Sequence, residues 1–231
     1  GQILNGQADG AHVAWYFLGS DEFIGEKISD SDFVEILYQV FLNRGSDAAG
    51  KKSWLAKLHY GASRLAVTAG LAGSPEYGYI CSLFGINTGD LFADFCHPVP
   101  LEQLEHLDSF RQQETAEELT QAYNEAWGIM RFYADSPLEN QVRAIGAELT
   151  GVILHNTPFP ETAAHYGDAY GFFVLRINSQ PALTDATGLC LNILGISYEI
   201  DSNSYNVTPW CHVIVNGVGW HVNKGLFTGP D

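Results

Sequence analysis

The stretch from Ala169 to Asn223 most constrains what this chain can fold into, because helical patterning changes to strand patterning within it. Apolar and polar residues alternate over 210–215 and again over 220–223, which predicts two strands. Asn216-Gly217, between them, has the composition of a two-residue hairpin turn. A helix over 180–194 precedes the strands. The stretch therefore predicts helices packed on an antiparallel sheet, which is an α+β fold.

Two anchors mark the ends of the helical part of this stretch. Ala169-Tyr170-Gly171 opens an apolar run, and Leu194-Gly195-Ile196 lies where helix changes to strand. Together with the later strands, these anchors resemble the bacterial transglutaminase-like fold, a papain-like superfamily of cysteine enzymes. The resemblance implies a papain-like α+β domain over about residues 101–231, with an antiparallel sheet. The matching residues are Tyr170, Gly171, Leu194, Gly195, Ile196, Trp210, Gly217, His221 and Val222.

Three positions depart from the catalytic pattern of that superfamily. In this register the nucleophile position is Gln180, the base position is Thr208 and the orienting-acid position is Asn223. A thiolate activated by an imidazole is the nucleophile in such sites, and loss of a whole triad costs roughly a million-fold in rate. The resemblance therefore implies a degenerate, non-catalytic domain with a binding, adhesion or scaffold role. The cleft expected to hold a ligand consists of Gln180, Thr208, Trp210 and Asn223.

Two cysteines leave an enzymatic alternative open. Cys190 lies within the predicted helix between two leucines, and Cys211 lies on a strand beside His212. An active cysteine peptidase or transamidase could use either thiol, with His212 or His221 as its base. A purely structural spacer is the third alternative.

The N-terminal end of the same helix has its own signal. Pro181 follows Gln180, and proline suits the first turn of a helix. We therefore expect Gln180 to cap this helix, where free backbone N–H groups are available to a ligand.

Neither histidines nor cysteines have the spacing of metal ligands. No Cys-x-x-Cys pair occurs, so no structural zinc site is expected. His212 and His221 lie on neighbouring predicted strands and could meet across the hairpin, but we predict neither a metal nor another cofactor. Four cysteines allow three disulfide pairings, and buried free thiols are the alternative. The candidate bridges are Cys81–Cys96 and Cys190–Cys211.

Residues 1–95 predict an all-α module with an internal repeat. Ser-x-Glu-aromatic elements begin at Ser20 and at Ser74, and a recurrence at this distance is typical of stacked helical units. The first copy is partial and the second spans about 30–85. This second copy resembles a bacterial extracellular repeat, domain of unknown function 4214, which carries no defined chemistry. The matching residues are Leu37, Tyr38, Leu42, Arg44, Asp47, Gly50, Trp54, Leu58, Gly61, Ser63, Arg64, Ser74, Pro75, Glu76 and Tyr77.

Local signals place the helix ends in this module. Asp30-Ser31-Asp32 predicts the start of a helix, and Gly45 predicts its left-handed end. Asp47 predicts the N-cap of the next helix. Arg44 could form an ion pair with Asp47 or with Glu76.

The charge of the chain excludes some classes of partner. With 27 acidic and 11 basic residues, the formal charge is −16, which disfavours binding to nucleic acids and to anionic membranes. No apolar run approaches the length of a membrane span, and no signal peptide opens the chain. We expect a fragment of a longer extracellular or cell-surface protein. Its partner would be a protein, a peptide or a glycan.

Overall fold

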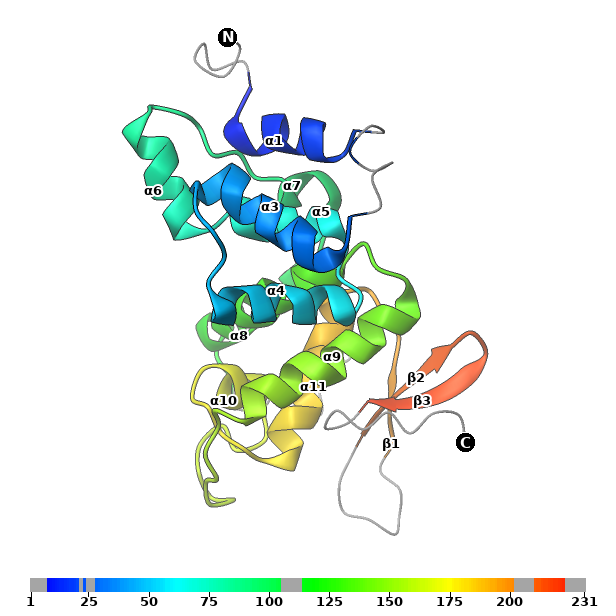
Figure 1. The fold of residues 1–231 in the computed structure, drawn as a ribbon. Helices are drawn as coiled ribbons and strands as arrows, with labels where there is room; N and C mark the ends of the chain where they lie inside the picture. The colour runs from blue at the N-terminus through cyan, green and yellow to red at the C-terminus, as the bar shows by residue number, and fades with distance from the viewer. Residues whose placement is uncertain (1–7, 21–22, 24–27, 105–113, 202–209, 223–231) are drawn as a thin grey trace. The chain divides into compact units, whose positions relative to one another are not determined.

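The backbone divides into two compact units, Gly1–His97 and Pro98–Asp231, which are described separately. The described residues combine helices with a three-stranded antiparallel sheet (Figure 1), so the predicted α+β class is confirmed. That each unit is an independent domain stays a prediction. Among the described residues, no helix has both the length and the apolar composition needed to cross a membrane. The residues that this computed structural model describes are 8–20, 23, 28–104, 114–201 and 210–222.

The described part of the N-terminal unit is helical. Its longest helix, α3, contacts α4, α5 and α6 and provides much of the buried apolar surface. Helices α1, α3, α4, α5 and α6 each begin after an Asp or Ser side chain that accepts a hydrogen bond from a backbone N–H three residues on. The bounds are α1 Gly10–Leu18, α3 Asp30–Leu42, α4 Ala48–His59, α5 Arg64–Ala72, α6 Pro75–Leu83 and α7 Phe92–Phe95.

The helix ends of this unit agree only partly with the sequence signals. Asp47 caps α4 as predicted, because its Oδ1 accepts from the Gly50 N–H at 2.8 Å. The cap of α3 is Ser29, so the prediction of Asp30-Ser31-Asp32 is wrong by one residue. The left-handed residue at its end is Asn43, with φ of 50°, and not Gly45. Asparagine tolerates this conformation because its side chain is short and polar.

The C-terminal unit is organised around α11. Most side chains of this helix are buried, and it packs against α8, α9, α10 and strand β2. Thr115 and Glu118 form a capping box at the start of α8. The helices are η1 Leu101–Gln103, α8 Ala116–Met130, η3 Arg131–Tyr133, α9 Leu138–Ile153, α10 Ala169–Phe173 and α11 Gln180–Ile193.

The sheet has the order β1-β2-β3, and both pairs of strands are antiparallel. Asn216 and Gly217 have φ of 53° and 81°, as a two-residue turn of this kind requires, so the predicted hairpin is confirmed. Alternate residues of β2 enter the core, and the residues between them, such as Ile214, form the outer face of the sheet. The strands are β1 Glu199–Asp201, β2 Trp210–Val215 and β3 Val218–Val222.

The Ala-Tyr-Gly anchor lies at α10 in a tightly packed corner. Asp168 caps this helix by accepting from the Gly171 N–H at 2.8 Å. A Cβ atom on Gly171 would overlap the backbone carbonyl of His165, so only glycine fits there. The Ala169 N–H donates to Asp185 of α11 at 2.7 Å. This corner fixes the position of α10 against the N-terminal half of α11.

Candidate functional site

Gln180, at the predicted nucleophile position, is the first residue of α11. The cap of the helix is Ser179, whose hydroxyl accepts from the Ala182 N–H at 3.1 Å. The prediction that Gln180 caps the helix is therefore wrong, because a serine one residue earlier already satisfies a free N–H of the first turn. The Gln180 carbonyl accepts from the Thr184 hydroxyl at 3.0 Å.

The other residues of the predicted cleft are only partly described. Thr208 and Asn223 lie outside the described residues. Trp210 is half-buried at the start of β2, opposite Asp201 of β1. Neither Gln180 nor Trp210 lines the two cavities described below. The predicted cleft therefore stays a prediction.

The first half of α11 lies against β2. The Cys211 thiol on this strand donates to the Thr184 carbonyl at 3.5 Å. Thr184 is one turn after Gln180 on the helix. The helix that begins at Gln180, the predicted nucleophile position, therefore packs on the strand that begins with Trp210.

The cysteines of the enzymatic alternative are buried. Cys190 and Cys211 have no exposed surface, and burial raises the pKa of both thiols above their ordinary range. The proximity of Cys211 raises the pKa of the Cys190 thiol further, and Asp185 has the same effect on Cys211. Such thiols are neutral at physiological pH, and a neutral thiol is a poor nucleophile. Cys81, Cys96, Cys190 and Cys211 are all buried, and none of the four forms a disulfide, so neither candidate disulfide is present.

The two histidines of the alternative site meet on the outer face of the sheet. His212 and His221 are partners in the register of β2 and β3, and their ring centroids are 5.2 Å apart. The prediction that they meet across the hairpin is confirmed. They lie on the face opposite to Cys211, which points into the core. Over the described residues, no group of three or more His, Cys, Asp or Glu side chains is arranged to hold a metal ion.

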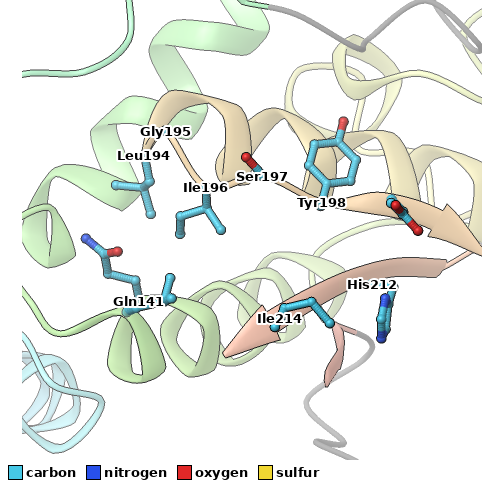
Figure 2. A pocket seen from close by; sticks show the side chains of 10 residues that line it. Gln141, Leu194, Gly195, Ile196, Ser197, Tyr198, His212 and Ile214 are labelled. Carbon is cyan, nitrogen blue, oxygen red and sulfur yellow. The ribbon is translucent and has the colours of Figure 1, made fainter. Parts of the chain in front are cut away.

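A cavity of about 590 Å³ lies on this same outer face. Figure 2 shows Leu194 and Ile196, from the loop after α11, pointing across the opening toward Gln141 of α9 and Ile214 of β2. Both apolar and hydrogen-bonding side chains line it, as is usual for ligand sites. The lining residues are Leu138, Gln141, Leu194, Gly195, Ile196, Ser197, Tyr198, Glu199, His212 and Ile214.

One polar group of the cavity has a fixed orientation. The Gln141 Nε2 atom donates to the carbonyl oxygens of Tyr133 and Ala134, at 3.1 and 3.0 Å. These two bonds assign the amide nitrogen to that side. The amide oxygen is therefore turned the other way, toward Ile196 (Figure 2). Glu199, on β1, adds a carboxylate opposite His212 in the register of the sheet.

The loop at residues 195–198 also borders a second cavity of about 220 Å³. Gly195 turns the chain there with φ of 70°. A Cβ atom on Gly188 would overlap the Tyr198 hydroxyl, so a glycine at this position of α11 lets the tyrosine lie close to the helix. Residues 195–198 therefore lie between two cavities and line both of them. Val99, Gln103, Leu104 and Asn192 complete the lining of the second cavity.

Sequence reasoning recognised this loop only as an anchor, through Leu194-Gly195-Ile196. It missed Gln141, Glu199 and Ile214 as lining residues, because they come from three separate elements. One signal was available in the strand pattern. Ile214 is an apolar residue at an outward position of a half-buried strand, and an outward apolar residue of this kind can mark a binding surface.

The comparison with protein families concerns the N-terminal unit. Residues 14–79 match the family model described as Domain of unknown function (DUF4214). The match contains α3, α4 and α5 in full and supports the predicted helical module. No curated protein and no solved structure matches the chain.

The family match includes the ion pair considered from the sequence. Arg44 donates from Nε and Nη2 to both carboxylate oxygens of Glu76, each at 2.7 Å, and its Nη1 lies 3.8 Å from Asp47. Both predicted partners of Arg44 are therefore confirmed. The pair connects the end of α3 to the first turn of α6. Because the side chains are exposed, it joins helices of the module and forms no enclosed site.

Proposed function

We propose that the C-terminal unit is a degenerate transglutaminase-like domain that binds a ligand and does not catalyse a reaction. The observation that carries this proposal is the state of the thiols. The nucleophile position holds Gln180, and the thiols of Cys190 and Cys211 are buried with a raised pKa. Thiolate chemistry needs a lowered pKa and an accessible sulfur. The described residues therefore support a binding role better than a cysteine peptidase or transamidase.

A second observation favours binding over a purely structural spacer. A spacer needs no open cavity, whereas the outer face of the sheet has one of about 590 Å³. Its volume lies within the usual range for small-molecule and peptide side-chain sites. The likeness of the N-terminal unit to an extracellular repeat supports a place at the cell surface or outside the cell. A protein, peptide or glycan is the expected partner.

Alkylation of the folded protein with iodoacetamide between pH 5 and 9 tests the absence of an active thiol. Mass spectrometry would identify the labelled cysteines. We expect no labelling of Cys190 or Cys211 without denaturant, and complete labelling of both in guanidinium chloride. Rapid labelling of either cysteine with a midpoint well below about 8.5, the value of an ordinary thiol, would refute the non-catalytic proposal. The enzymatic alternative would then be favoured.

A further inference from the structure

We propose that the cavity between α9, the loop at 194–198 and the outer face of the sheet binds an arginine side chain of a peptide or protein. This inference rests on the proposed binding role of the C-terminal unit and adds the chemistry of the ligand. It concerns a site separate from the predicted cleft at Gln180 and Trp210, neither of which lines this cavity.

The walls of the cavity suit an aliphatic stem. Leu194 and Ile196 come from the loop, Leu138 comes from α9 and Ile214 from β2. Ile214 is 56% exposed and Leu138 is 37% exposed, so apolar surface at this opening remains in contact with water. Covering such surface stabilises a complex by about 25 cal/mol for each Å². An arginine side chain buries its methylene groups along apolar surface while its charged end stays near polar groups.

The polar groups of the cavity suit a ligand with many hydrogen-bond donors. The Gln141 amide oxygen faces Ile196 (Figure 2) because the amide nitrogen is held by two carbonyl groups. The Glu199 carboxylate is exposed on β1. Both groups accept hydrogen bonds, and a guanidinium carries five N–H donors and no acceptor.

The charge of the cavity points to the same ligand. Among the described residues, its lining contains the carboxylate of Glu199 and no lysine or arginine, and the whole chain has a formal charge of −16. A phosphate or carboxylate ligand would therefore meet a negative group that no lysine or arginine of the described lining offsets. A cationic ligand is attracted both by Glu199 and by the overall field.

The test uses the full chain and two blocked tripeptides, acetyl-Gly-Arg-Gly-amide and acetyl-Gly-citrulline-Gly-amide. Citrulline has nearly the shape of arginine but no charge. Titrations followed by amide NMR signals should show the arginine peptide shifting residues 195–199 and 212–214. We expect the citrulline peptide to bind about threefold more weakly than the arginine peptide, as for the loss of a partly exposed charge pair.

Two variants separate a specific contact from general attraction to an acidic protein. Glu199→Gln should weaken binding of the arginine peptide about threefold. Glu117→Gln makes the same change of charge at an exposed position of α8 outside the cavity, and it should leave binding unchanged. Equal effects of the two variants, or equal binding of the two peptides, would overturn the inference.

The outcomes also separate this inference from the proposed function. Absence of arginine-peptide binding, with thiols that stay inert to iodoacetamide, rejects the arginine site and leaves the non-catalytic proposal standing. Rapid labelling of Cys190 or Cys211 rejects the proposed function whatever the peptides do.

Discussion

Each unit of the protein contains a histidine that lies between two carboxylates, and the two arrangements differ in burial. In the N-terminal unit, Nδ1 of His12 lies 2.7 Å from Asp9 and its Nε2 lies 2.7 Å from Asp94. The His12 side chain is 40% exposed, and that of Asp94 is 61% exposed. Solvation by water and screening by salt therefore reduce the contribution of these contacts to stability.

In the C-terminal unit the corresponding histidine is His165. Its Nδ1 lies 2.8 Å from Asp168, and its Nε2 lies 3.4 Å from Glu118. The His165 side chain is 14% exposed and that of Asp168 is only 2% exposed. Asp168 also accepts from the Gly171 N–H and caps α10. The comparison shows that a histidine between two carboxylates can join exposed helices in one unit and complete a buried corner of the backbone in the other.

Among the changes that test this comparison, removal of the buried Asp168 carboxylate should lower the free energy of unfolding most. Asp168→Ala leaves the Gly171 N–H and the His165 Nδ1 without their partner in a buried site. Buried polar groups that lose their partner cost about 1–3 kcal/mol each, so we expect the free energy of unfolding to fall by about 2–3 kcal/mol. Urea denaturation of the full chain measures this change. A loss below about 0.5 kcal/mol would show that the corner does not depend on Asp168.

Loss of the proton from His12, in the exposed arrangement, should lower the stability of the protein by an intermediate amount. Hydrogen bonds with Asp9, and to a smaller extent with Asp94, raise the pKa of His12 above its ordinary value of 6.5. The stabilisation is therefore fully present below about pH 6.5. It is lost as the pH rises through the higher pKa of the folded state, because neutral imidazole can donate to only one carboxylate.

Thermal unfolding of the wild type and of His12→Gln from pH 5.5 to 9 checks this expectation. The midpoint difference between the two proteins should be largest at low pH and should shrink as the pH rises. A difference that grows with pH would contradict the assignment, since it would mean that the neutral imidazole is the stabilising form.

Removal of the exposed carboxylate should have the smallest effect. Asp94→Ala takes away a partner of His12 that is mostly in contact with solvent, so the free energy of unfolding should fall by at most about 1 kcal/mol. The loss should become smaller still in 1 M sodium chloride, where surface charges are screened. If Asp94→Ala proved as costly as Asp168→Ala, burial could not explain the difference between the two arrangements.

The local features of the fold were largely predictable from sequence. Asp47 caps its helix as expected, because a cap is a contact between residues three positions apart. The hairpin at Asn216-Gly217 formed for the same reason, since its two residues favour positive φ. The errors were also local. Ser29 and Ser179 took capping positions that neighbouring residues had been expected to hold.

The candidate site was less predictable. The sequence indicated that His212 and His221 would meet, because strand alternation and a two-residue turn determine which residues face each other. It did not indicate the cavity beside them. Gln141 comes from a helix about seventy residues earlier, and its orientation depends on the carbonyl oxygens of Tyr133 and Ala134. Neither the helical nor the strand repeat of the sequence indicates that residues so far apart in the chain lie close together.

The sequence by itself determined the helix cap at Asp47, the alternation of the strands, the hairpin and the absence of a cysteine at position 180. These depend on residue types and on contacts between near neighbours. Only the tertiary structure decided that Cys190 and Cys211 are buried with raised pKa values, and that Gln141 and Glu199 line the same cavity. Burial and the meeting of distant groups depend on how the elements pack, which no local pattern specifies.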